Sequence, residues 1–363
     1  MGIFIEVVVN VLLMPKNMTR IGKRERTVNK MSKLFIIGNG FDCYGHDMPT
    51  KYSDFKQFLL EKYPNIMSIP PRIPTIPTIY PATDRLRIYA EVERVRYILH
   101  VLDACQNDQW SNLEAVLGDK IFEAFVDDIL DEEYNTEPTI SFENNDAIAN
   151  GIAEMTDFLS VGIVMEDTFD SLKEYFYQWV TEKLGRLRYD EYEKKKEFTQ
   201  VLSCDNEAEP NIFMNFNYTL TLEKLYGISG KNVFHIHGKV GDSKKKVFFG
   251  HGKGEWEISM EDVPTLASSF YQISRNLRKN TWLAIKQNKE LFERIRNVSE
   301  IYPYGFSFSD VDMVYIDKIS EKVDPTQVTW YFNTYDTDNN PHFIELIKKR
   351  GYKIRQGYSW DRT

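Results

Sequence analysis

The chain has 363 residues, a net charge of −9, 42% hydrophobic residues and 14% aromatic residues. This length and composition exclude a disordered chain, and the negative charge argues against a general nucleic-acid coat protein, although a local basic groove stays compatible with it. Three cysteines far apart in the sequence exclude a disulfide framework and a zinc motif and indicate a reducing, cytoplasmic setting, while no apolar run reaches the ~18–20 residues of a membrane span.

Residues 1–30 differ in composition from the rest of the chain. Residues 3–13 are mostly apolar, and residues 16–30 are basic. A secretory signal carries its charge before its apolar run, so the order is reversed here. We expect a flexible or non-native extension, because Met31 directly precedes the first convincing strand. The alternative is a membrane-surface anchor, for which the apolar part is short.

The sequence KLFIIGNGFD, residues 33–42, predicts a buried strand that ends in a glycine turn. Strand, glycine turn and helix together present backbone N–H groups to a phosphate in α/β folds. Glycine allows close approach and positive φ at Gly38 and Gly40, and Asn39 is the next most tolerant residue type. Cys43 stands where the full dinucleotide fingerprint has a third glycine, so a plain tight turn is the alternative.

Residues 56–205 are predicted to be mostly helical. A helix reaches about Tyr63, and six prolines between Pro64 and Pro81 then indicate a loop. Apolar residues at three- and four-residue steps predict a helix over 86–102, and Ser111 with Glu114 forms a capping box before another. Residues 131–146 are acidic and turn-rich, and helices are expected again over 147–203. We expect this insertion to cover the carboxyl edge of the sheet.

Strands alternate with helices from residue 211 onward. Strands are expected at 211–216, 233–237 and 247–249, and a long helix then follows at about 268–296. Further strands are expected at 300–307, where the strand runs into a turn, and at 328–334 and 352–356. Pro303 suits an edge strand or a strand end. The pattern predicts a Rossmann-like, mostly parallel α/β sheet built from 31–55 and 206–363, with 56–205 as a large helical insertion after the first strand.

Polar residues and glycines follow the expected strands, and in a parallel sheet ligands bind at the carboxyl ends of strands. His237 is the best candidate base because imidazole titrates near neutral pH. His235 lies two residues earlier and is expected to face the same side, so a buried, hydrogen-bonded pair is the alternative. The candidate nucleotide-binding residues are Gly38, Asn39, Gly40, Phe41, Asn215, Gly238, His251, Gly305, Ser307 and Asp310.

Several polar candidates have a structural alternative. Asn217 can hold a ribose hydroxyl or a water, or it can form an Asx turn. Asp310 and Asp312 can bind Mg²⁺, but such residues more often cap a helix. Glu114 can simply be the capping-box partner of Ser111. The spacing of histidine and cysteine does not indicate a metal site.

The sequence resembles the bacteriophage abortive infection AbiH family. FIIGNGFD with MPTKYSDF resembles the opening block, and the later blocks NFNYTLTLEKLY, HIHG, FGHG and GFSFSDVD follow in the family's order. WSNLEAVL, residues 110–117, resembles a block in the helical part, and the resemblance covers about 31–340. Asp47 stands where the family usually has glycine, and Pro303 replaces a usual strand residue.

The same blocks are more distantly similar to sirtuin-like NAD-binding domains. The resemblance implies that Gly38 and Gly40 cradle a pyrophosphate, that Asn217 contacts the nicotinamide ribose, and that the His237-Gly238 pair supports chemistry there. Gly305 and Ser307 resemble the turn that holds the adenosine ribose. The departures are Asp42 for a small residue, Thr219 for an aspartate, and the lack of a zinc-binding cysteine quartet.

These resemblances imply a defence protein that cleaves or senses a nicotinamide dinucleotide. The first hypothesis is an NAD⁺ glycohydrolase without a further cofactor, in which His237 is the base, Asn217 orients ribose or water, and Asp42 or Glu114 supplies a negative charge. The alternatives are a non-catalytic dinucleotide sensor and a metal-dependent nuclease using Asp42, Asp310 and Asp312. Each of these three hypotheses is compatible with activation by a phage component and with a homo-oligomer.

Overall fold

A computed structural model describes residues 32–64, 66, 84–105, 113–121, 123–125, 146–203, 210–253 and 267–359. The expected extension (1–30), Ser111 of the expected capping box, and most of the two expected loops (64–81 and 131–146) lie outside the described residues.

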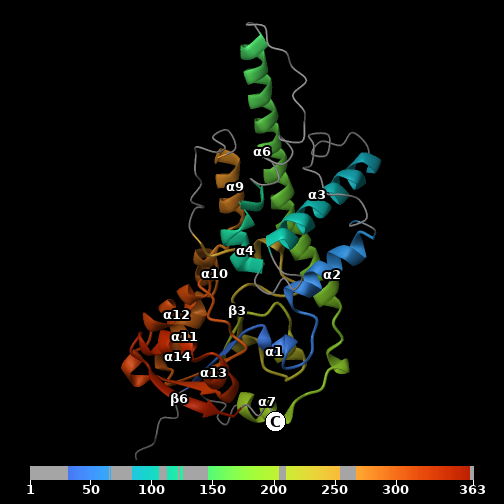
Figure 1. The fold of residues 1–363 in the computed structure, drawn as a ribbon. Coiled ribbons are helices and arrows are strands. Elements are labelled where there is room, and N and C mark those ends of the chain that lie inside the picture. Colours follow the sequence, from blue (N-terminus) through green and yellow to red (C-terminus); the bar gives the residue numbers. More distant parts are fainter. Residues whose placement is uncertain are drawn as a thin grey trace, which may run out of the picture. The chain divides into compact units, whose positions relative to one another are not determined.

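The described strands form one six-stranded sheet in which every pairing is parallel (Figure 1). The order is β3-β2-β1-β4-β5-β6. The Rossmann-like α/β prediction is therefore confirmed. The strands are β1 (Lys33–Ile37), β2 (Ile212–Asn215), β3 (Val233–His235), β4 (Glu300–Tyr304), β5 (Thr329–Asn333) and β6 (Lys353–Tyr358).

The two faces of the sheet are covered by different helices. Side chains alternate along β1: Leu34 and Ile36 pack with α10, α11, α12 and α14, whereas Phe35 and Ile37 pack with α1, α7 and α8. The described helices are α1 (Gly40–Cys43), α2 (Tyr52–Lys62), α3 (Asp84–Cys105), α4 (Leu113–Asp119), α6 (Asp146–Gln178), α7 (Lys196–Leu202), α8 (Thr221–Lys224), α9 (Ala267–Leu277), α10 (Thr281–Gln287), α11 (Lys289–Arg294), α12 (Met313–Ser320), α13 (Thr334–Asn339) and α14 (Pro341–Lys348).

The helical insertion has a core of its own, built from α2, α3, α4 and α6. The helix α9 joins this core, and it packs against α6 although it comes much later in the chain (Figure 1). A segment outside 56–205 therefore takes part in the helical layer.

The strand expected at 247–249 is absent from this described segment, and β3 ends at His235 rather than at residue 237. His251 forms only an isolated bridge with Arg278. That bridge also explains why the expected long helix at 268–296 is wrong. The His251 amide donates to the Leu277 carbonyl, and the Lys279 amide donates to the His251 carbonyl, so the helix is interrupted and Asn280 caps a new one.

Pro303 lies in an interior strand, because β4 runs between β1 and β5. The expectation of an edge strand is wrong, but the residue is close to the carboxyl end of β4. The register between β4 and β5 stops at the pair Ile301 and Trp330, two residues earlier. Because Pro303 lies beyond the last pair of the β4–β5 ladder, its missing N–H removes no hydrogen bond from that ladder.

The direction of the strand order reverses between β1 and β4, which is where open parallel sheets bind ligands. Three glycines, Gly38 and Gly40 after β1 and Gly305 after β4, let the two turns touch. A Cβ on Gly38 would lie 2.3 Å from the Gly305 carbonyl oxygen, and one on Gly305 would lie 2.5 Å from the Phe41 nitrogen. Gly305 has φ +61°, whereas Asn39 has φ −59°. Close approach, rather than positive φ, is thus what the first turn requires.

Candidate functional site

A cavity of about 1160 Å³ lies where the carboxyl ends of the central strands meet. It is larger than the roughly 300–1,000 Å³ of pockets for drug-sized ligands, so a dinucleotide fits by volume. Glu114 and Trp179, from the helical part, contribute to its wall. The predicted residues that line the cavity are Gly38, Asn39, Gly40, Asp42, Glu114, Asn217, His237, Gly305, Ser307 and Asp310.

The other predicted residues lie outside the cavity lining. Phe41 packs its ring among aromatic side chains, and Asn215 accepts a hydrogen bond from the Asn217 amide through Oδ1 at 3.1 Å. Gly238 has φ +83° and a backbone neighbour where a Cβ would lie. His251 is buried, with Nε2 2.9 Å from the Ser274 carbonyl oxygen. These four residues therefore make contacts within the protein and do not contribute to the cavity lining.

The amides of the glycine turn are largely engaged within the protein. Gly38 donates to the Tyr304 carbonyl at 2.9 Å, Gly40 to the Gly305 carbonyl at 3.0 Å, and Phe41 to the Gly38 carbonyl at 3.0 Å. The Asn39 side chain donates to the Thr50 carbonyl at 2.8 Å. The helix α1 is also only one turn long. The turn therefore offers a pyrophosphate fewer donors than its sequence indicates.

His237 lies fully buried at the cavity, beside a network of charges. Its Nε2 is 3.4 Å from Asp312 Oδ1, and that oxygen is 3.6 Å from Lys279 Nζ. Burial and the nearby Lys279 ammonium lower the pKa of His237, so its ring is neutral at pH 7. A neutral imidazole can accept a proton, which a general base requires.

Lys279 holds two carboxylates at the cavity wall. Its Nζ lies 2.7 Å from Glu114 Oε1, and the lysine side chain is 1% exposed. Burial alone would lower the pKa of Lys279, but Asp312 and Glu114 offset it and keep the pKa raised. Burial likewise opposes the charge on Asp312, yet Lys279 and His237 hold the pKa of Asp312 well below its ordinary value.

The expected helix-capping role does not describe Asp312, whereas the capping box expected of Glu114 involves Ser111, which lies outside the described residues. Asp312 stands at the N-cap position of α12, but its side chain makes no capping bond there and instead accepts from Ser309 Oγ at 3.1 Å. Glu114 is the partner of Lys279. Lys279 itself carries no local sequence signal, because it falls inside what reads as one long helix.

Asp42 and Thr219, the two departures from the sirtuin-like pattern, contact each other. The Thr219 hydroxyl donates to Asp42 Oδ2 and also lies 3.0 Å from the Thr221 hydroxyl. Burial raises the pKa of Asp42 to about 6, although both threonine hydroxyls oppose this effect. Asp42 is thus a buried carboxylate with a neutral hydrogen-bond partner.

Unpartnered polar atoms converge on the cavity. Within the described structure, Asp42 Oδ1 and Asn217 Oδ1 are buried without a hydrogen-bond partner, whereas His237 Nε2 and Asp312 Oδ1 lie 3.4 Å from each other. All four residues line the same cavity. Buried polar atoms are nearly always paired in folded proteins. Asp42 Oδ1 and Asn217 Oδ1 are thus hydrogen-bond acceptors that the described structure leaves unsatisfied.

A family model described as "Bacteriophage abortive infection AbiH" matches residues 34–334. The chain belongs to the AbiH family. The match includes every residue of the site from Gly38 to Asp312, and membership suggests a role in abortive infection. No curated protein and no solved structure matches the chain. The family prediction is confirmed, and the similarity to sirtuin-like domains stays a prediction.

Two further findings concern the described residues of this AbiH chain. No group of three or more His, Cys, Asp or Glu side chains among the described residues is placed to hold a metal ion. Of the helices that the structure describes, none is both long and apolar enough to cross a membrane.

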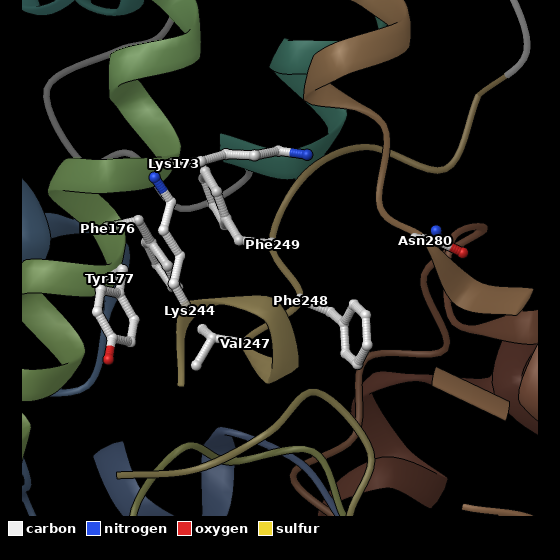
Figure 2. A pocket seen from close by; sticks show the side chains of 8 residues that line it. All are labelled: Lys173, Phe176, Tyr177, Lys244, Val247, Phe248, Phe249 and Asn280. Carbon is white, nitrogen blue, oxygen red and sulfur yellow. The ribbon is translucent and has the colours of Figure 1, made fainter. Parts of the chain in front are cut away.

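A second cavity of the AbiH chain, of about 100 Å³, lies between α6 and residues 244–249 (Figure 2). Burial lowers the pKa of Lys173 there to about 8, and its Nζ donates to the Arg278 carbonyl at 3.2 Å. The ends of Lys173 and Lys244 point in different directions (Figure 2). This space holds only a few waters, so the large cavity is the candidate site.

Proposed function

We propose that this AbiH protein acts in abortive infection by hydrolysing NAD⁺ at the bond between nicotinamide and ribose. The observation that carries the proposal is that two unpartnered buried oxygens, Asp42 Oδ1 and Asn217 Oδ1, and the His237–Asp312 pair belong to residues that line one cavity at the reversal of the strand order. A ribose presents several hydroxyl groups to such a set. NAD⁺ is the substrate, and the proposal needs no further cofactor.

In the proposed reaction, water attacks C1′ of the ribose as the bond to nicotinamide breaks. Nicotinamide leaves as a neutral ring with the bonding electron pair, and the water gives up one proton to the base. His237 is the base, because its ring is neutral and the residue lines the cavity. Asn217 orients the ribose or the water through its unpartnered Oδ1.

The ribose gains positive charge as nicotinamide departs, and a negative group stabilises that charge. Asp42 suits this role better than Glu114. Lys279 Nζ lies 2.7 Å from the Glu114 carboxylate and neutralises it, whereas the hydrogen-bond partner of Asp42 is a threonine hydroxyl. Asp42 therefore keeps its charge for the ligand.

The geometry argues against one alternative function, the nuclease, and favours the other, the sensor. The nuclease hypothesis is weakened because Lys279, a cation of the protein itself, contacts Asp312. A dinucleotide sensor without turnover is the second candidate, since the amides of Gly38 and Gly40 are engaged with the turn after β4. A sensor would bind NAD⁺ and pass the ligand state to a partner.

The test is to incubate the purified protein with NAD⁺, NADP⁺, ATP and RNA and to separate the products by chromatography, with and without phage-infected lysate. We expect nicotinamide and ADP-ribose from NAD⁺. His237→Ala and Asn217→Ala should each lower the rate about 10²–10⁴-fold, the range for a positioned acid–base group, and should abolish growth arrest on overexpression. His100→Ala, a histidine on α3 away from the cavity, is the control.

The same variants separate the alternatives. NAD⁺ that binds in calorimetry but is never consumed, even with phage lysate present, would replace hydrolysis by the sensor function. A structural role of His237 predicts instead that His237→Ala loses a few kcal/mol of stability through an unpaired partner. Urea unfolding of each variant measures that loss directly.

A further inference from the structure

The main chain of Asn217 is fixed from both sides. Its amide donates to Asn215 Oδ1 at 3.1 Å, and its carbonyl oxygen lies 3.0 Å from His235 Nδ1. The side-chain Oδ1 of Asn217 has no partner within the described structure and lines the cavity. The direction of that side chain is therefore set by the backbone, and the backbone is held by Asn215 and His235.

His235 is in turn held by Glu223 of α8. Its Nε2 lies 2.9 Å from Glu223 Oε1, and the two side chains are 5% and 14% exposed. The carbonyl of Asn217 and the carboxylate of Glu223 can only accept hydrogen bonds. A ring that carries a single proton makes one of these two bonds, and a ring with both nitrogens protonated makes both.

His235 and His237 have different tasks although they are two residues apart. The strand ends at His235, and only His237 lines the cavity. The expectation that both rings face the same side assumed a strand through residue 237, and β3 ends at His235. Lys239 Nζ lies 3.8 Å from Glu223 Oε1 on the outer side of the pair. His235 contacts the site through Asn217, and its charge also lowers the pKa of Asp42, an effect that the Glu223 carboxylate opposes.

We propose that His235 is a positioning residue for Asn217, with Glu223 fixing the imidazole so that its Nδ1–H holds the Asn217 carbonyl and aims the Asn217 side chain into the cavity. This inference rests on the proposed function, because it assigns a task within the same reaction. Partners behind a working group commonly change activity or affinity 10–100-fold when removed, and small misplacements of a reacting group have effects of similar size.

The test is a double-mutant cycle on NAD⁺ hydrolysis. We expect His235→Gln to lower kcat about 10–100-fold in the wild type but less than about 3-fold in the Asn217→Ala background, because two residues that act through one contact are not additive. Glu223→Ala should resemble His235→Gln, whereas Glu223→Gln keeps an acceptor and should retain most activity. Lys239→Gln, which removes only the outer charge, is the matched control.

Equal losses from His235→Gln in both backgrounds would overturn the inference, since a merely structural role predicts additivity. Glu223→Gln as inactive as Glu223→Ala would also overturn it. If the wild type binds NAD⁺ without consuming it, the cycle is run on the dissociation constant with the same expectations. A wild type that neither binds nor consumes NAD⁺ refutes the proposed function, a result distinct from additivity in an active enzyme.

Discussion

Asp42→Asn should stabilise the protein at neutral pH. Burial raises the pKa of Asp42 to about 6 from an ordinary 3.8, and each pKa unit corresponds to about 1.4 kcal/mol. The pKa of Asp42 is higher in the folded protein than in the unfolded one, so protonation of Asp42 stabilises the folded state. This stabilisation is fully present below pH 3.8 and is lost as the pH rises to about 6. The charged carboxylate therefore lowers the free energy of unfolding by about 3 kcal/mol at pH 7.

Urea unfolding at pH 7.5 and at pH 4 measures this difference. We expect Asp42→Asn to gain up to about 3 kcal/mol at pH 7.5 and almost nothing at pH 4, because the wild-type side chain is then largely protonated in the folded state. Asp310→Asn is the control. Asp310 is an exposed acid at the same cavity, and its replacement should stay within about 0.5 kcal/mol of wild type. An Asp42→Asn gain that does not shrink in acid, or a loss at pH 7.5, would refute this reasoning.

Two other variants test the contacts that hold the site together. Lys279→Met should lower stability by about 3–5 kcal/mol, because it leaves the half-buried Glu114 carboxylate and the buried Asp312 carboxylate without their cation. Lys244→Met, which breaks an exposed pair with Glu174, should change stability by less than about 1 kcal/mol, and equal effects of the two variants in urea unfolding would contradict the network. Gly305→Ala should lower stability by about 2–4 kcal/mol, because it adds a backbone clash to the strain of positive φ. Gly227→Ala is the control, because Gly227 has φ +70° and nothing lies within 4 Å of its Cβ position, so this variant measures the backbone strain alone. A loss of stability as large as that of Gly305→Ala would refute the close approach of the two turns.

The parts of this fold that sequence predicts are those with a local cause. The run KLFII alternates between two buried faces and ends in Gly38, so a strand and a tight turn follow from five residues and a glycine. Asn217 and His237 could be placed at one edge because each follows a predicted strand, and parallel strands end at the same edge. Both line the cavity.

The parts that sequence does not predict depend on contacts between distant segments. The break at Lys279 exists because His251 inserts its backbone between Leu277 and Lys279, and the residues around the break alone continue a helical pattern. The same insertion carries Lys279 to the cavity, where Glu114 of the helical part meets it. The end of β3 at His235 likewise separates two histidines that a regular strand would place on one face.

Asp42 and Thr219 show how the site and the fold constrain one another. The Thr219 and Thr221 hydroxyls offset only part of the effect of burial on Asp42, whose Oδ1 has no partner in the described structure. The buried carboxylate therefore still opposes folding by about 3 kcal/mol at neutral pH. A lysine beside Asp42 would satisfy the charge, as Lys279 does for Glu114 and Asp312, but it would also cancel the field in the cavity. A neutral donor orients the carboxylate and leaves its charge available to a cationic ribose. The instability of Asp42 is therefore what its proposed role predicts, and Asp42→Asn should raise stability and lower NAD⁺ hydrolysis together.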